Sequence, residues 1–181
     1  MERWDLFDRN GEPLGRTIRR GERLCAGEYH QVVHIWMLNS ADRLLIQRRS
    51  RRRKLMPGVW AVTSGSVIAG ETPREAARRE LGEELGVQLP DSAFESIGCM
   101  TRRNSLCHVF VVRRNITVPE MRLQREEVSA VRWVAAQQLV DMLKQRQFHH
   151  YGAPYFRFVF DGITRLTGRD LAPEEDFKCS R

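Results

Sequence analysis

Residues 65–87 form the stretch that most constrains this chain, and they read GSVIAGETPREAARRELGEELGV. With U for an apolar residue, the pattern is G-x5-E-x7-R-E-U-x-E-E-x-G-U. Its fixed positions are Gly65, Glu71, Arg79, Glu80, Leu81, Glu83, Glu84, Gly86 and Val87. A helix rich in glutamate and arginine is often only a solvated face with salt bridges, which is the alternative interpretation. Because the loop, the charged residues and both glycines all fall at the spacings of the pattern, the stretch indicates a functional site.

The residues after Glu71 predict where a helix begins. Thr72 and Glu75 have the spacing of a capping box, in which each side chain bonds the backbone N–H of the other. Pro73 stands at the first helical position, where its missing N–H costs nothing. The helix is therefore expected to begin at Pro73 and to end at Gly86.

Two faces of this helix differ in character. One is an apolar stripe with a four-residue repeat, made of Ala77, Leu81 and Leu85. The other carries glutamates three and four residues apart, namely Glu80, Glu83 and Glu84. Like charges at this spacing repel by a few tenths of a kcal/mol per pair. Hard carboxylate oxygens suit Mg2+, with Mn2+ as the alternative, and such sites share the ion with substrate phosphates.

Before this stretch, the sequence predicts a hairpin and two strands. Asn10-Gly11 is a two-residue turn signal between the extended segments 4–8 and 12–19. Residues 31–38 form a continuous apolar run, as in a strand buried on both faces, and a second strand is expected at 43–47. Trp60 follows a Pro-Gly break and is expected near the site, in the core or stacked on a base.

After the helix, strands are expected at residues 106–112 and 128–134. A short helix is expected around Leu139 to Leu143, and an amphipathic helix from Pro154 to Thr167. Alternating strands and helices place the chain in the mixed α/β class. We expect a hairpin extension at 1–28, one domain at 29–168 and a loosely ordered tail at 169–181.

The charge of the chain is unevenly distributed. Thirty Lys and Arg against twenty-three Asp and Glu give a net charge of +7, although the glutamate stretch is locally acidic. Six basic residues fall among the seven from Arg48 to Lys54. A basic tract can bind nucleic acid, but in a surface loop of this length a solvated face or a clamp for small anions is favoured.

No targeting or metal-cysteine pattern accompanies these features. The N-terminus is charged from its second residue, and no apolar run approaches the roughly twenty residues of a membrane span. The four cysteines contain no C-x-x-C pair, so we expect reduced thiols in a cytoplasm.

The stretch at 65–87 resembles the signature of the Nudix hydrolase superfamily, and no position departs from it. The resemblance covers roughly residues 30–145. It implies a Nudix fold, a mixed β-sheet between α-helices (α/β/α), here with the N-terminal hairpin added. It also implies Mg2+-dependent hydrolysis of a nucleoside diphosphate linked to another moiety.

Carried onto matching positions, the resemblance also assigns roles. Glu80, Glu83 and Glu84 would hold the metal, with Glu80 also a candidate for orienting or deprotonating water. Arg79 would orient Glu80, and Glu71 would support the loop and the helix. Family members often add a glutamate from outside the signature, for which the candidates are Glu127, taken as a metal ligand, and its neighbour Glu126.

A narrower resemblance is to the isopentenyl-diphosphate isomerase branch. It is carried by H-x5-W at His30, by LLIQRR, by the basic stretch to Lys54, and by PGVW ending at Trp60. There, Arg49 and Lys54 would hold the substrate diphosphate, and His30 would match a metal-binding histidine. The isomerase needs a cysteine and a second histidine where this chain has Gly65 and Val67.

We therefore expect a hydrolase of the isomerase-like subgroup. The alternatives are the isomerase itself and a non-catalytic module that binds a nucleotide or RNA. The expected partner is a small-molecule diphosphate, bound by Arg49, Lys54 and Trp60, rather than nucleic acid or a membrane. A homodimer stays open.

Overall fold

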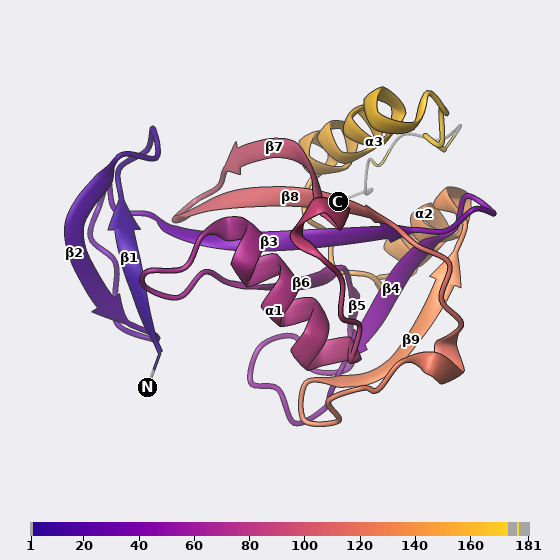
Figure 1. The fold of residues 1–181 in the computed structure, drawn as a ribbon, viewed down its shortest axis with the longest axis horizontal. Helices are drawn as coiled ribbons and strands as arrows, with labels where there is room; N and C mark the ends of the chain where they lie inside the picture. Colours follow the sequence, from indigo (N-terminus) through magenta and orange to yellow (C-terminus); the bar gives the residue numbers. More distant parts are fainter. Residues whose placement is uncertain (1, 174–176, 178–181) are drawn as a thin grey trace.

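The computed structural model describes residues 2–173 and Phe177. A mixed sheet of seven strands lies between helices, as the α/β/α prediction requires (Figure 1). The strands are β3 (His30–Leu38), β4 (Leu44–Arg49), β5 (Trp60–Ala61), β6 (Thr63–Ser66), β7 (Glu95–Thr101), β8 (Ser105–Arg113) and β9 (Val128–Val134). The main path runs β5-β4-β3-β8-β7, with β6 paired to β3 and β9 to β4. Among these seven described strands, β3 and β8 are the only pair that runs parallel.

The central strand β3 changes neighbour along its length. Its first half pairs with β6, from Val32 opposite Ser66 to Ile35 opposite Thr63. At its far end it pairs with β4 through Leu38 and Leu44. Two different strands therefore leave β3 on the same side, and side chains from both faces of the sheet can meet between them.

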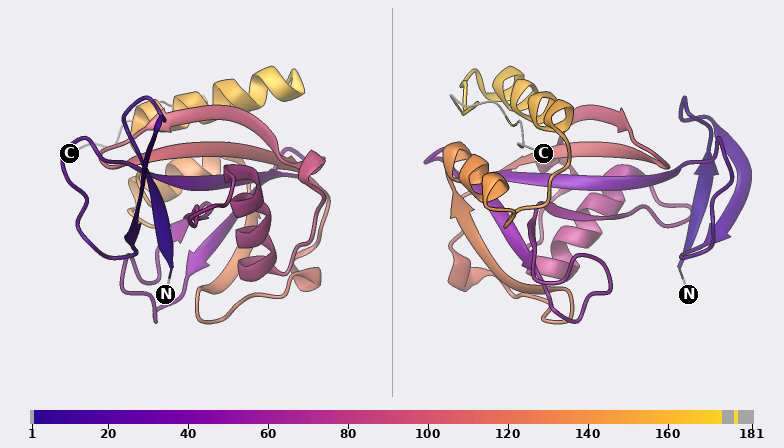
Figure 2. Two further views of the ribbon diagram at one scale, coloured as in Figure 1. Left: turned by 60° about the vertical axis from the view of Figure 1, so that its left-hand side comes forward. Right: turned by 180° about the vertical axis from the view of Figure 1, so that it is seen from behind.

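Helices cover both faces of this sheet. Helix α1 (Pro73–Leu85) packs on one face, through a core cluster that includes Val33, Leu81 and Leu85. Helices α2 (Ala136–Lys144) and α3 (Ala153–Thr167) pack on the other, as the view from behind shows (Figure 2). Two short 3-10 turns complete the list, η1 (Asp91–Ala93) and η2 (Val118–Glu120). None of the helices in the described part of the chain is long and apolar enough to cross a bilayer.

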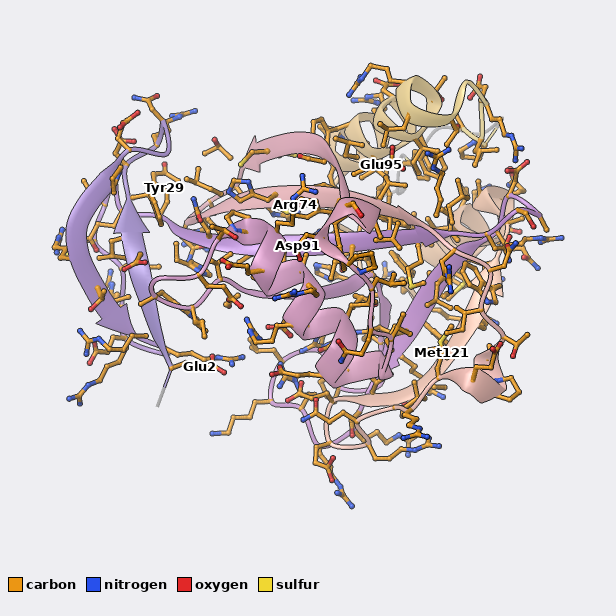
Figure 3. All side chains as sticks on the ribbon, viewed as in Figure 1. Glu2, Tyr29, Arg74, Asp91, Glu95 and Met121 are labelled. Atoms are coloured by element: carbon orange, nitrogen blue, oxygen red, sulfur yellow. The ribbon has the colours of Figure 1, made fainter. Side chains whose placement is uncertain are left out.

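The predicted ends of α1 are confirmed. Thr72 N donates to Glu75 Oε2 at 2.8 Å, and Glu75 N donates to Thr72 Oγ1 at 3.3 Å, which is the reciprocal capping box. Gly86 ends the helix in the left-handed region with φ 68°, and its N–H bonds Gly82 O. At the start of the helix, Arg74 Nη1 donates to Asp91 O at 2.8 Å, which ties α1 to η1 (Figure 3).

The N-terminal hairpin is confirmed as a separate two-stranded sheet. Strands β1 (Arg3–Phe7) and β2 (Pro13–Arg19) pair antiparallel and stand at one end of the main sheet (Figure 1). Phe7 and Tyr29 exchange both backbone hydrogen bonds at 2.9 Å, which joins the hairpin to the start of β3. The Trp4 ring stacks on the His30 ring with centroids 4.1 Å apart.

Strand β7 had no counterpart among the predicted elements. Its burial alternates poorly, and Gly98, at φ 127°, lies where the register with β8 shifts. A bulged strand loses the period-two pattern on which sequence recognition depends.

The C-terminal tail is only partly described. Residues 174–176 and 178–181 lie outside the described residues, so the expected loose order there stays a prediction. Phe177 is buried, and its ring stacks on that of Phe156 with centroids 4.7 Å apart.

Candidate active site

A cavity of about 550 Å³ collects most of the residues that the sequence singled out. One side is acidic and comes mainly from α1. The predicted residues that line the cavity are Arg49, Arg79, Glu80, Glu83, Glu84 and Glu127. The cavity also receives Glu2 and Arg20 from the N-terminal segment, and Glu2 lies at the start of the hairpin (Figure 3).

Arg79 donates hydrogen bonds to the glutamates on the acidic side of the cavity. Its Nε and Nη2 donate to the two carboxylate oxygens of Glu71, at 2.9 and 3.0 Å. Nη1 donates to Glu80 at 2.8 Å and to Glu83 at 3.2 Å. Burial disfavours the charge of Arg79, but the hydrogen bonds and charges of Glu71 and Glu80 outweigh it and raise its pKa. A permanently charged guanidinium therefore holds three carboxylates in fixed relation.

Glu71 lies behind Arg79 rather than in the cavity. Besides Arg79, its carboxylate accepts a hydrogen bond from Ile68 N at 3.2 Å, and its own N–H donates to Ile68 O at 3.0 Å. These bonds close the loop that leads from β6 into α1. Arg79 Nη2 adds a bond to Ser66 O at 3.0 Å.

Glu80 lies directly against the backbone of β6. A Cβ placed on Gly65 would stand 1.9 Å from Glu80 Cδ, so only glycine leaves room for this carboxylate. Burial raises the pKa of Glu80, the charge of Arg79 lowers it, and Glu83 and Glu2 raise it further. Steric overlap with Glu80 thus explains why the first position of the signature, residue 65, is a glycine.

Glu84 is the most buried of these carboxylates, at 5% exposure. Thr63 Oγ1 donates to Gln47 Oε1 at 3.0 Å, which fixes the Gln47 amide so that its Nε2 donates to Glu84 Oε2 at 2.7 Å. Burial, with added repulsion from Glu80, raises the pKa of Glu84 to about 8 despite the Gln47 bond. A nearby cation would strongly stabilise the ionised form of an acid in this position.

Glu127 lines the cavity from the turn before β9, where it forms an ion pair with Arg53. Its neighbour Glu126 is more exposed, does not line the cavity and lies 3.6 Å from Arg52. Of the two candidates outside the signature, the structure therefore brings Glu127 to the acidic side.

The three predicted substrate-binding residues lie in different places. Arg49 is buried at 9% exposure, lines the cavity, and donates from Nε to Leu55 O at 3.0 Å. Lys54 is exposed and outside the cavity lining, where Arg53 stands instead. Trp60 lies outside the lining too, and the Arg132 guanidinium stacks 4.6 Å from its ring centre.

The opposite side of the cavity was not predicted from the sequence. His34, Arg102, His149 and Tyr151 line it, and we call these four residues the donor wall. They come from β3, from the β7–β8 turn and from the segment before α3. His34 lies inside a predicted strand where no motif marks it, and no sequence motif connects the other three residues.

The acidic side fits a divalent cation in its chemistry. Its donors are hard carboxylate oxygens, which divalent cations prefer. Burial and neighbouring negative charges raise the pKa values of two of these carboxyl groups, Glu80 and Glu84. Among the described residues, however, no three acidic, histidine or cysteine side chains converge closely enough to hold a metal ion as they stand. Arg79 and Arg53 hold the glutamates instead, so cation binding requires these side chains to turn.

His30 does not join this site. Its ring is covered by Trp4, it does not line the cavity, and its Nδ1 is buried without a hydrogen-bond partner among the described residues. Burial lowers the pKa of His30 to about 4. The match to a metal-binding histidine of the isomerase branch therefore has no counterpart in the geometry.

Comparison with known proteins places this geometry in a family. The NUDIX domain family matches residues 28–156. An uncharacterized Nudix hydrolase of Listeria monocytogenes is 33% identical over 157 residues, covering 86% of this chain and 90% of the relative. An isopentenyl-diphosphate Delta-isomerase of Streptomyces coelicolor is 28% identical over 179 residues, covering 91% and 86%.

Among solved structures, a crystal structure of a Deinococcus radiodurans protein superposes with a TM-score of 0.73. The two chains are 26% identical, and the match covers 87% of this chain and 98% of the other. The predicted fold is confirmed, as is the likeness to both hydrolases and isomerase relatives.

Proposed function

The chain belongs to the Nudix family, and we propose that it is a Mg2+-dependent hydrolase that cleaves the diphosphate linkage of a nucleoside diphosphate joined to another moiety. Mn2+ is the alternative ion. The observation that carries the proposal is the buried Glu84, held by Gln47 beside Glu80 in a cavity large enough for a small molecule. An enclosed carboxylate with a raised pKa is a common feature of catalytic sites.

The residues that would hold the ion are Glu80, Glu83 and Glu84 of α1, with Glu127 from the turn before β9. When bound, such an ion offsets the negative charge of the diphosphate and lowers the pKa of a bound water. Glu80 is placed by Gly65 and Arg79, so its carboxylate can orient or deprotonate the attacking water. Arg79 is in turn oriented by Glu71.

Substrate binding is proposed for Arg49, which lines the same cavity as the glutamates and lies close enough to Glu84 for their charges to interact. The loop 50–58 also brings Arg53 to the lining, so a phosphate could draw this side chain away from Glu127. Lys54 and Trp60 would touch only a substrate that extends beyond the cavity.

The isomerase alternative meets a steric obstacle. The position that matches the isomerase cysteine is Gly65, where any side chain would overlap Glu80. The position that matches the second histidine is Val67, an apolar residue at 5% exposure beside α1. A cysteine at 65 and Glu80 in its present place exclude each other, which favours the hydrolase.

A non-catalytic binding module is the third alternative. A module that only binds a nucleotide or RNA has no need for the buried carboxylates of α1, which repel a phosphate. The Thr63–Gln47–Glu84 hydrogen bonds hold a buried acidic side chain at the cavity, which a module that only binds phosphates does not require.

The proposed compartment is the cytoplasm. The three cysteines in the described part of the chain, Cys25, Cys99 and Cys107, are free thiols, as expected where thiols are kept reduced.

The test is Mg2+-dependent phosphate or nucleotide release from nucleoside triphosphates, dinucleotides, sugar nucleotides and isoprenyl diphosphates. Wild type is compared with Glu84→Gln and with the control Glu126→Gln, which changes an exposed glutamate outside the cavity. We expect turnover in wild type and in the control but not in Glu84→Gln. Interconversion of isopentenyl and dimethylallyl diphosphate without phosphate release would favour the isomerase, and metal-independent RNA binding without turnover would favour the binding module.

A further inference from the structure

A buried hydrogen-bond chain fixes the proton on His34. Trp36 Nε1, which can only donate, bonds Tyr155 Oη at 3.0 Å. Tyr155 Oη lies 2.6 Å from His34 Nδ1, and these are its only two hydrogen-bond partners among the described residues. Because the indole cannot accept, the phenol proton must go to His34 Nδ1. The imidazole therefore carries its own proton on Nε2, as a donor.

His34 keeps this donor without a net charge. The residue is 7% exposed, and burial lowers its pKa to about 3, with further lowering by the charges of Arg102 and His149. Tyr155, whose pKa is raised well above its ordinary value by burial, stays protonated. The imidazole is thus a neutral N–H group in the cavity lining at ordinary pH.

Arg102 supplies a cation on the same side of the cavity. Its guanidinium carbon lies 5.6 Å from the ring centres of both Tyr151 and Tyr155, a cation–π arrangement that holds the head group in place. No described carboxylate forms an ion pair with it, and its Nη1 is buried without a hydrogen-bond partner among the described residues. A buried guanidinium N–H without an acceptor is costly, so Arg102 would gain from an anion that binds beside it.

The donor wall and the glutamates approach the cavity from opposite faces of the sheet. His34 shares the α3 face of β3 with Val32 and Trp36, whereas the glutamates belong to α1 on the other face. The two sets meet in one cavity because β6 and β4 leave β3 at different points. A single molecule in this cavity can therefore contact both sets.

We propose that Arg102 and His34 form an anion subsite that binds a phosphate group of the substrate other than those of the scissile linkage. The inference rests on the proposed function, and it names the substrate class as diphosphates that carry an additional phosphate. Arg102 offers a fork of donors that matches phosphate oxygens, and His34 adds a neutral donor beside it. Tyr151 supports the subsite, with its ring 4.9 Å from that of His34 and 4.8 Å from that of Tyr155.

The first experiment measures binding of inorganic phosphate to the metal-free protein by calorimetry, with a chelator present. Wild type is compared with Arg102→Gln, with Arg102→Lys and with the control Arg103→Gln, an exposed arginine of the same turn that does not line the cavity. We expect Arg102→Gln to weaken phosphate binding roughly tenfold to a hundredfold. Arg102→Lys should fall between, since it keeps the charge but loses the fork, and Arg103→Gln should match wild type.

A parallel titration with acetate distinguishes a phosphate subsite from one for carboxylates. Binding of phosphate but not acetate supports the proposal. Tighter binding of acetate would reassign the subsite to a carboxylate group. Equal phosphate affinity in Arg102→Gln and Arg103→Gln, or no phosphate binding by wild type, would overturn the proposal.

The second experiment compares kcat/KM for a nucleoside triphosphate and for the diphosphate of the same base. Arg102→Gln should lower the triphosphate-to-diphosphate ratio roughly tenfold or more, whereas Arg103→Gln should leave it unchanged. Glu84→Gln separates the two proposals, because it should abolish turnover of both substrates yet preserve phosphate binding by the metal-free protein. An unchanged ratio in Arg102→Gln would count against the subsite while leaving the hydrolase intact.

Discussion

Arg79 and Glu71 form a two-pronged ion pair, with Nε to Oε1 at 2.9 Å and Nη2 to Oε2 at 3.0 Å. The same guanidinium reaches Glu80 and Glu83 through its remaining nitrogen. One loop glutamate therefore determines how an arginine presents two helix glutamates to the cavity.

Substitution Glu71→Gln should loosen this arrangement. A neutral amide has one oxygen, and its NH2 group cannot accept the second hydrogen bond of the guanidinium, so Arg79 and Glu80 lose their fixed positions. We expect unfolding free energy to fall by about 1 to 3 kcal/mol and turnover to fall with it. Denaturant unfolding and kcat measured on the same preparation test this. The control is Glu95→Gln, which breaks the more exposed Arg113–Glu95 pair outside the cavity and should leave kcat unchanged.

Substitution Gly65→Ala should remove activity while the fold persists. The new methyl group would overlap Glu80, which has to leave its place beside β6. Gly82→Ala is the matched control, because there the new methyl group meets only the end of the flexible Gln88 side chain. Alanine favours a helix over glycine by up to about 1 kcal/mol, so this control should keep activity and gain stability. Equal activity in the two variants would contradict the role given to Glu80.

Substitution Glu127→Gln should weaken Mg2+ binding, and Glu126→Gln should not. Only Glu127 lines the cavity with the helix glutamates. Removing a residue that only hydrogen-bonds a metal ligand commonly lowers metal affinity roughly 10- to 100-fold. Removing Glu127, a proposed ligand itself, should lower Mg2+ affinity at least as much. Mg2+ titration followed by calorimetry gives the comparison. If both variants bind Mg2+ like wild type, the extra ligand is not in this turn.

Stability should fall in mild acid because of His34. The pKa of this histidine is about 3 in the folded protein, against 6.5 for the ordinary side chain. Below pH 6.5 the histidine is therefore protonated in the unfolded chain but stays neutral in the native state. Stability is lost as the pH falls from 6.5 toward 3. Each pH unit well inside that window costs about 1.4 kcal/mol from this group.

The groups that face the His34 imidazole are Arg102, His149, Tyr151 and Tyr155. Unfolding free energies measured from pH 7 to 4 in wild type and in His34→Asn test the prediction. The variant should show a shallower decline, and His150→Asn, which changes an exposed histidine, should decline like wild type. Parallel curves for wild type and His34→Asn would show that the native state accommodates the proton.

The sequence predicted those parts of the fold that depend on local chemistry. The capping box at Thr72, the helix end at Gly86 and the N-terminal hairpin are settled by neighbouring residues, and all three are confirmed. The hairpin turn is longer than the two residues expected, because Gly11 N bonds Asp8 O and Asp8 N bonds Glu12 O. Strand β7 was missed because the bulge at Gly98 breaks its alternation. Strands β5 and β6 are too short, at two and four residues, to show a period.

The site divides along the same line. The acidic side could be predicted because its residues lie within a single helix and the loop before it. The donor wall could not, since His34, Arg102 and Tyr151 are far apart in sequence and meet only through strand pairing and α3 packing. The basic loop shows a similar difference. Composition identified the loop, but the path of its backbone decides that Arg53, and not Lys54, lines the cavity.

The contact between Gly65 and Glu80 also bears on how the two chemistries of this family could interchange during evolution. A thiol introduced at 65 would displace Glu80, the carboxylate proposed to act in hydrolysis, before any isomerase centre existed. With the role proposed for Glu80, its loss first would leave neither activity. With this backbone, a side chain at 65 and Glu80 in its present place exclude each other, so exchange of the two centres would need a change at both positions.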